Sequence, residues 1–148
     1  MYNDTITLFN RYSSNAGDIW FPTVLYNVDV NLDKAVAVSK FGENTTDKGQ
    51  VHIKYQTKGG VPYVKAKRYV LPKEWENQLT DEQKNSITFT SGEEFDFIYV
   101  GEYPEALIKD DDYTKGFFDY MKKTYDEVYA ITSVAKYDVI PHFEISIK

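Results

Sequence analysis

Alternation of apolar and polar residues with a period of two constrains the fold of this 148-residue chain more than any other feature. Side chains along a β-strand point alternately to the two faces of a sheet, so this period predicts strands with one buried face. The clearest run is Val51-His52-Ile53-Lys54-Tyr55-Gln56. The chain ends in the same pattern, with His142-Phe143-Glu144-Ile145-Ser146-Ile147-Lys148. We therefore expect the odd-numbered residues of both runs to face the core.

Other strands are predicted by segments rich in aromatic and β-branched residues. These segments lie around residues 6–8, 19–30, 36–38, 63–70, 87–89, 95–100 and 128–134. The turn residues Asn15-Ala16-Gly17-Asp18 predict a hairpin over residues 12–20. Pro22 cannot donate to a ladder, which predicts an edge or a bulge in the second strand. Residues 95–100 are apolar at nearly every position, so we expect them to form the most buried strand.

Two helices are expected between the strands. Pro72 suits the first position of a short helix, in which Trp75 and Leu79 would share one face. A longer helix is predicted near residues 112–124, where apolar residues recur at helical spacing. Its acidic start, Asp110-Asp111-Asp112, and Lys122-Lys123 near its end suit the helix dipole. Gly116 within this helix would cost about 1 kcal/mol relative to alanine.

These elements predict a mainly β fold. About seven or eight strands, one short helix near residues 72–79 and one longer helix near residues 112–124 are typical of a small β-barrel or sandwich. The length suits a single β-rich domain over residues 1–148, because no repeat, low-complexity tract or linker divides the chain. The predicted turns Phe41-Gly42-Glu43-Asn44 and Lys58-Gly59-Gly60 separate strands within this domain.

Composition excludes several classes of chemistry. The chain has no cysteine, which excludes a disulfide framework, a thiolate metal site and a cysteine nucleophile. The formal net charge of −6 gives no general attraction to phosphate backbones or anionic lipids. No stretch approaches the roughly 18 apolar residues of a membrane helix. The N-terminus carries Asp4 where a signal peptide would be cationic, so we expect a protein that starts inside a cell and has no membrane partner.

The histidines and one acidic run are the first candidates for a metal or acid–base site. His52 lies on the polar face of a predicted strand and His142 follows Pro141, so each is interpreted as solvent-facing or locally hydrogen-bonded, with a nucleophile–base pair as the alternative. Asp110-Asp111-Asp112 could hold calcium but lacks the alternating ligands, central Gly and bidentate Glu of a calcium loop. An acidic first helical turn is the preferred interpretation. We therefore expect no catalytic, cofactor-binding or metal-binding residues, no cofactor and no enzyme activity.

The densest basic stretch is Lys65-Ala66-Lys67-Arg68-Tyr69, with Tyr63 beside it. Basic residues interleaved with aromatic ones can follow single-stranded nucleic acid along a barrel groove. A solvated strand face or a docking patch for an acidic partner is the alternative, which an acidic chain favours. The glycines belong to no phosphate-binding loop. Among 23 acidic residues some carboxylate pair for hydrolysis is always conceivable, but no spacing favours one.

Several short segments carry a family resemblance, in this order along the chain: Ile6–Arg11, Asp18–Val28, Tyr69–Trp75, Ile87–Glu93, Ala130–Val134 and Pro141–Ile145. Together they resemble small morphogenesis proteins of tailed bacteriophages and prophages of Gram-positive bacteria, described as minor capsid or head–tail connector components. The sequence departs from that pattern at Asn27, where Gly is frequent, and at Phe143, which replaces Trp. It also lacks a terminal Gly-Gly.

The resemblance implies a β-barrel that docks at the capsid portal or upper tail, with no catalytic residues to carry over. The expected function is that of a structural virion protein, a head–tail connector, head-completion or minor capsid component that acts by protein–protein assembly. Its expected partners are portal, adaptor or tail proteins, in a ring-type homo-oligomer. Its expected location is the virion, after a period in the host cytoplasm. Nucleic acid would be met only through proximity to packaged DNA.

Such a protein would engage its neighbours through strand edges or extended loops. The polar segments Phe41–Gln50 and Gly101–Asp112 are the candidate assembly loops. A β-barrel binding module for single-stranded nucleic acid or a small ligand is the alternative function, and binding lost when Lys65, Lys67 and Arg68 become Glu would favour it. A hydrolase is the third, which a pocket lined by carboxylates with perturbed pKa values would favour.

Overall fold

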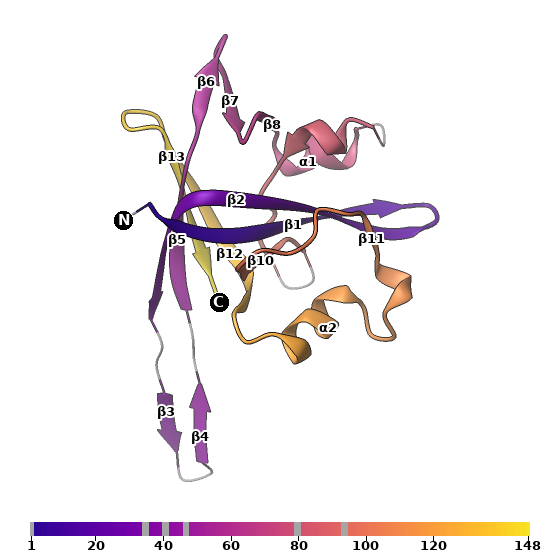
Figure 1. Ribbon diagram of the computed structural model, residues 1–148, viewed down its shortest axis with the longest axis vertical. Coiled ribbons are helices and arrows are strands. Elements are labelled where there is room, and N and C mark those ends of the chain that lie inside the picture. The colour runs from indigo at the N-terminus through magenta and orange to yellow at the C-terminus, as the bar shows by residue number, and fades with distance from the viewer. Residues whose placement is uncertain (1, 34–35, 40–41, 46–47, 79–80, 93–94) are drawn as a thin grey trace.

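The computed structural model describes residues 2–33, 36–39, 42–45, 48–78, 81–92 and 95–148. Its centre is a closed barrel of six antiparallel strands (Figure 1). Around the barrel these are β1 (Asp4–Ser14), β10 (Phe97–Val100), β12 (Val128–Tyr137), β13 (His142–Ile147), β5 (Lys48–Lys54) and β2 (Gly17–Asp33), which pairs back to β1. The prediction of a small, mainly β barrel is therefore confirmed.

The barrel closes because β2 is long and changes partner. Its first part forms the predicted hairpin with β1, and its last residues pair with β5. Between these parts Leu25 pairs with Ile6 but Val28 pairs with Asp4, so two residues of β2 face one of β1. Such a bulge bends and twists the strand. Asn27 lies in it with a φ of 56°, a left-handed conformation that Asn tolerates better than most residues.

Pro22 also lies where the sequence predicts an interrupted ladder. It pairs with β1 on one side. On the other side β2 pairs with β11 (Ile108–Lys109) only through Ile19 and Trp20, and with β5 only from Asp29 onward. Pro22 therefore falls at an edge position between two partners, where its missing N–H costs no ladder hydrogen bond.

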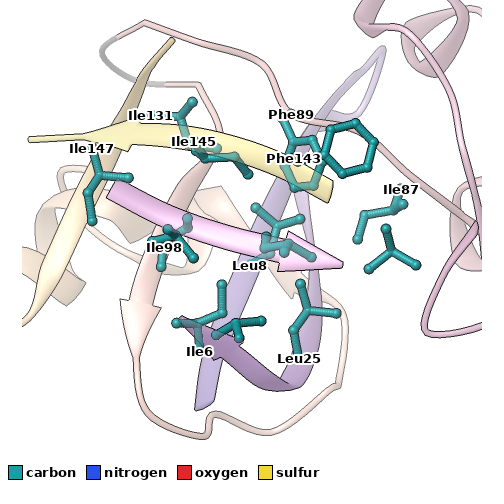
Figure 2. Close-up of a cluster of buried hydrophobic side chains, with 14 of the residues drawn as sticks. Ile6, Leu8, Leu25, Ile87, Phe89, Ile98, Ile131, Phe143, Ile145 and Ile147 are labelled. Carbon is teal, nitrogen blue, oxygen red and sulfur yellow. The ribbon is translucent and has the colours of Figure 1, made fainter. Parts of the chain in front are cut away.

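Alternate residues of the barrel strands fill its interior (Figure 2). The barrel-strand residues labelled there are Ile6, Leu8, Leu25, Ile98, Ile131, Phe143, Ile145 and Ile147, and Ile87 and Phe89 join this cluster from outside the barrel strands. Phe143 is fully buried, with its ring centroid 4.7 Å from that of Tyr69 and 5.0 Å from those of Tyr55 and Phe89. Val51, Ile53 and Tyr55 are buried as well, so the predicted inward faces of both alternating runs are confirmed.

The strand predicted as the most buried is shorter than its apolar run. Phe97 and Ile98 are fully buried in β10, whereas Phe95 lies before the strand and is 48% exposed. Asp96, the one charged residue of the run, is buried instead. The apolar run therefore predicted the strand correctly but placed Phe95 in the wrong environment, and it gave no prediction for the side chain of Asp96.

The longer helix begins later than predicted. Asp110–Asp112 form a separate 3-10 turn, η2, and α2 covers Phe117–Thr124. Gly116 lies between them with a φ of 89°, which interrupts any helix and favours glycine. Phe117 and Met121 of α2 pack on the outside of the barrel, against Phe9, Trp20 and Phe97.

The shorter helix, α1, covers Pro72–Glu76 and begins at proline as predicted. Trp75 is buried against Phe21 and Val70, and its Nε1 donates to the carbonyl oxygen of Arg11 at 2.8 Å. Leu79, expected on the same face, lies outside the described residues. Neither helix, nor any other in the described ranges, is long and apolar enough to cross a bilayer.

Hairpins outside the barrel add strands beyond the seven or eight predicted. β3 (Val36–Ser39) and β4 (Gly42–Thr45) form a two-stranded sheet that extends from one end of the molecule (Figure 1). A second sheet contains β6 (Gln56–Lys58), β7 (Val61–Val64), β8 (Lys67–Tyr69) and β9 (Ser86–Ile87), which follows the 3-10 turn η1 (Gln83–Asn85). The β6–β7 hairpin extends at the opposite end, near the turn between β12 and β13.

Candidate functional site

The turn between β12 and β13 carries the most exposed apolar side chains of the described chain. Val139 is 98% exposed and Ile140 is 74% exposed. The turn is anchored beside the β6–β7 hairpin, because the N–H of Tyr55 donates to the carbonyl oxygen of Pro141 at 3.4 Å. We call residues 138–141 the hairpin tip.

The base of the hairpin tip is well ordered by polar and aromatic contacts. The Tyr137 and His142 rings stack at 4.9 Å and 10°. The hydroxyl of Tyr55 lies 2.8 Å from the carbonyl oxygen of Tyr137 and 2.5 Å from Oδ1 of Asp138. Burial raises the pKa of Tyr55, and the hydrogen bond to Asp138 raises it further. The tip is therefore a fixed projection of the barrel wall.

Positive charge gathers beside this tip. Residues 48–73 contain seven Lys or Arg and no Asp or Glu. A pocket of about 330 Å³ opens there, lined by Lys54, Tyr55, Gln56, Lys58, Tyr63, Lys65 and Ala66. The Nζ of Lys58 lies 5.5 Å from the Tyr63 ring centroid. This end of the molecule differs in charge from the rest of an acidic chain.

The predicted basic stretch is tied into the fold rather than free. Lys65 pairs with Glu105 at 3.1 Å and Arg68 pairs with Glu74 at 3.1 Å. Lys67 donates to Oγ1 of Thr23 at 2.8 Å, and burial lowers its pKa. The contacts of these three cations join the β7–β8 hairpin to neighbouring segments. In the described chain, Lys54 and Lys58 form no ion pair with a carboxylate.

Asp110 of the acidic run has a structural role. Its Oδ1 accepts hydrogen bonds from Nε1 of Trp20 at 2.9 Å and from the N–H of Phe117 at 2.8 Å. Asp110 thus caps the N-terminus of α2 from outside the helix, which satisfies a donor that a helix end leaves unpaired. The prediction that Asp110–Asp112 form the first turn of the longer helix is wrong, because they form a separate turn before it. The predicted stabilisation of the N-terminal end of this helix is confirmed for Asp110.

The two histidines, interpreted separately in the sequence, converge on one carboxylate. Nε2 of His142 lies 3.4 Å from Oε1 of Glu144, and Nε2 of His52 lies 3.9 Å from the same oxygen. Nδ1 of His52 faces Oδ2 of Asp29 at 3.9 Å. In the described part of the chain, no three His, Asp or Glu side chains form a group that could hold a metal ion. Proximity of the two rings follows from the pairing of β5 with β13, which sequence alone did not provide.

The candidate assembly loops are not free loops. In the first, Gly42–Thr45 is strand β4 and residues 48–50 begin β5, while residues 41, 46 and 47 lie outside the described residues. In the second, the N–H of Tyr103 donates to Oγ1 of Thr7 at 3.0 Å, and its ring packs 5.5 Å from that of Phe9. The segment from residue 101 to 112 therefore covers the barrel wall instead of extending into solvent.

Asp96 is a perturbed group that the sequence did not indicate. It is 1% exposed and accepts hydrogen bonds from the N–H groups of Arg11 and Thr90 and from Nδ2 of Asn10, at 2.8–2.9 Å. Burial raises its pKa to about 7, against the opposing effect of these donors. The only sign of this burial in the sequence was the position of Asp96 between two apolar residues, in Phe95-Asp96-Phe97.

A groove of about 1210 Å³ separates α2 from β12 and the base of the β1–β2 hairpin. Its charged lining has both signs, with Asp110, Asp119 and Asp126 beside Arg11, Lys115, Lys122 and Lys148. Asp96 does not line it. The hydrolase interpretation therefore gains no support from Asp96, which is buried away from this groove.

The comparison with protein families covers the whole chain. Residues 1–148 match DUF6751, a family of unknown function. The chain belongs to this family. No curated protein and no solved structure matches it. In this DUF6751 member the hairpin tip, the basic pocket and the two histidines all lie at or beside the β12–β13 hairpin.

Proposed function

We propose that this chain is a structural virion protein of a tailed phage or prophage, a head–tail connector, head-completion or minor capsid component that acts by protein–protein assembly. The observation that carries the proposal is the apolar hairpin tip. Val139 and Ile140 are β-branched residues in a turn, where Gly, Asn, Asp, Ser and Pro are preferred. Turn chemistry does not explain them and the core does not contain them, so contact with another protein is the reason we assign.

The architecture supports assembly in a second way. The six barrel strands pair in a closed ring, which protects their paired edges from other chains. The two-stranded β3–β4 sheet, in contrast, projects beyond the barrel with its own edges. Such edges suit strand addition by a partner. The phage setting, with portal, adaptor or tail partners and a ring, rests on the sequence resemblance.

The proposal is tested in particles made from the genome that encodes the chain. Gradient-purified particles should contain the chain by mass spectrometry, in a fixed ratio to the major capsid protein. Deletion of its gene should leave heads and tails unjoined or incomplete in electron micrographs. Infectious particles that lack the chain, or full assembly after the deletion, would overturn the proposal.

A second candidate function, a binding module for single-stranded nucleic acid or a small ligand, is favoured by the basic pocket. Its lysines alternate with tyrosines, as in surfaces that follow a phosphate backbone and stack bases. Binding of an oligonucleotide should then weaken steeply with salt. Lys54→Glu and Lys58→Glu should abolish it, while Glu replacements of Lys65, Lys67 and Arg68 would also disturb contacts within the fold. Absence of salt-dependent binding would exclude this function.

A further inference from the structure

β12 is paired on both sides only along its first residues. On the side away from β13 it pairs with β10 over residues 128–130. The backbone of Ile131 still has partners on this side, because its N–H donates to the carbonyl oxygen of Asp96 at 3.4 Å and its own carbonyl oxygen accepts from Gly92 at 2.9 Å. Beyond it, over residues 132–137, no strand of the described chain pairs with β12 on this side. We call residues 132–137 the free edge, which ends at the hairpin tip on the outside of the molecule (Figure 1).

The register with β13 fixes which backbone groups the free edge presents. Ala130 and Lys148 exchange both of their backbone hydrogen bonds, at 3.0 Å. Pairs of this kind alternate along an antiparallel ladder with pairs that exchange none. Counting back along β13 from Lys148, the hydrogen-bonded residues of β12 are Ser133, Ala135 and Tyr137. The N–H and C=O groups of Val134 and Lys136 therefore point away from β13, into the free edge.

The free edge lacks the usual protection against pairing. Natural proteins protect strand edges with proline, bulges or charged side chains that face a would-be partner. The free edge contains no proline, and the bulge between Ile131 and Ser133 lies at its start. Its one charged side chain, Lys136, is held by its own chain, since Nζ lies 2.7 Å from Oδ1 of Asp138 and 5.2 Å from the Tyr55 ring centroid. The edge is therefore open to a strand of another chain.

The free edge is complementary to a second copy of itself. Two such edges can pair antiparallel about a two-fold axis through Ala135, so that Val134 of each copy is opposite Lys136 of the other. This register joins the outward backbone groups in about four hydrogen bonds. Val134 packs against the barrel core, so its neighbours lie on the outer face. There Ala135 is opposite its own copy and Ser133 is opposite Tyr137, whose ring is 45% exposed.

We propose that two copies of this chain pair through their free edges, in an isologous dimer that joins the two β12 strands in one continuous sheet. A second copy is favoured over a strand of another protein because this register satisfies the outward backbone groups of both copies and opposes no like charges. About six residues a side are fewer than in a standard interface, so we expect a weak dimer with a dissociation constant on the order of 100 μM. The dimer is independent of the virion proposal, because the purified chain should form it alone.

Cysteine cross-linking tests the register directly, because the chain contains no cysteine of its own. Ala135→Cys places two thiols at the axis, where Cα atoms of a directly opposed pair lie about 4.5 Å apart, within the span of a disulfide. Mild oxidation at about 100 μM, near the expected dissociation constant, should give a covalent dimer. Ser133→Cys is the matched control, since it lies on the same face and is more exposed. Its thiols would be about 14 Å apart and should cross-link at least about tenfold more slowly.

Two further variants test the pairing in other ways. Ser133→Cys combined with Tyr137→Cys places directly opposed thiols across the interface, so cross-linking should return. Ala135→Glu and Ala135→Lys each oppose like charges at the axis and should sediment as monomers. An equimolar mixture of these two charge variants should form a heterodimer, because opposite charges then meet. Circular dichroism shows that each variant is folded before it is compared.

The wild-type chain should sediment increasingly as a dimer as its concentration rises through about 100 μM. A wild-type chain that stays monomeric up to about 1 mM would overturn the dimer and leave the free edge to a strand of another protein. Equal cross-linking of folded Ala135→Cys and Ser133→Cys would overturn it as well, because it would show collision without this register. A mixture of Ala135→Glu and Ala135→Lys that remains monomeric would also contradict the pairing at Ala135.

Discussion

Phe143 and Val139 belong to the same hairpin, four residues apart, yet they occupy opposite environments. Phe143 is fully buried between three aromatic rings, whereas Val139 is 98% exposed. Burial of a large apolar side chain stabilises a fold by about 1.5–3 kcal/mol, so the fold itself accounts for Phe143. It does not account for Val139 or its neighbour Ile140. We therefore propose different tasks for the two regions, in which the barrel provides stability and the hairpin tip provides a surface for contact.

The largest expected effect separates the two regions by stability. Phe143→Ala should lower the free energy of unfolding by about 3–5 kcal/mol, because it removes a fully buried ring and leaves a cavity. Val139→Ala should change it by less than about 0.5 kcal/mol, as expected for an exposed site. Urea denaturation of both variants measures the difference. Equal losses in the two variants would contradict the division between barrel and tip.

A second contrast concerns carboxyl groups in the two regions. Asp96 in the barrel wall has its pKa raised from 3.8 to about 7 by burial. The folded state therefore binds more protons than the unfolded state, and the stability that Asp96 contributes at low pH should be lost as pH rises from about 4 to about 7. One pKa unit corresponds to about 1.4 kcal/mol, so the loss could approach about 4 kcal/mol.

Asp138 at the tip should act in the opposite direction. Its pKa is lowered by hydrogen bonds from Lys136 and Tyr55, so its small contribution is present above the unfolded pKa and is lost as pH falls. Denaturation across this pH range, with Asp96→Asn to remove the titrating group, measures the balance. A wild-type stability that does not fall between pH 4 and 7, or a fall that persists in Asp96→Asn, would show that Asp96 does not control it.

The smallest expected effect concerns the outer face of β5 and β13. His52→Ala and His142→Ala should each change the free energy of unfolding by about 0.5 kcal/mol or less, because both rings lie on the surface side of the barrel. The inward neighbours Ile53 and Phe143 differ from them by one position and are buried. A thermal melt measures the effect. A loss as large as that of Phe143→Ala would place the histidines among the residues that hold the barrel together.

The barrel was predictable because its strands follow the period of two that a half-buried strand requires. Val51, Ile53, Phe143 and Ile145 are inside where the alternation places them. The boundaries of α2 and β10 were not predictable in this way. Gly116 was interpreted as a tolerated helix residue but has a φ of 89°, and hydrophobic runs do not show that Asp96 finds three hydrogen-bond donors inside the wall.

The candidate site was less predictable, because it depends on which strands are neighbours. His52 and His142 are 90 residues apart, and only the antiparallel register of β5 and β13 brings both to Glu144. The same limit applies to Lys65 and Arg68, whose acidic partners are Glu105 and Glu74. Exposure of Val139 and Ile140 could have been suspected from two β-branched residues beside a proline in a turn.

Replacement of the hairpin tip in the genome that encodes the chain tests most directly whether this protein works through its tip. Val139→Ser combined with Ile140→Ser should leave the purified protein as stable as wild type, yet reduce the yield of complete particles at least tenfold, the loss for about 1.4 kcal/mol of binding energy. Phe95→Ser, at an apolar residue that is 48% exposed elsewhere on the surface, is the matched control and should assemble normally. Wild-type particle yield from the double tip variant would contradict the claim that this protein works through its tip.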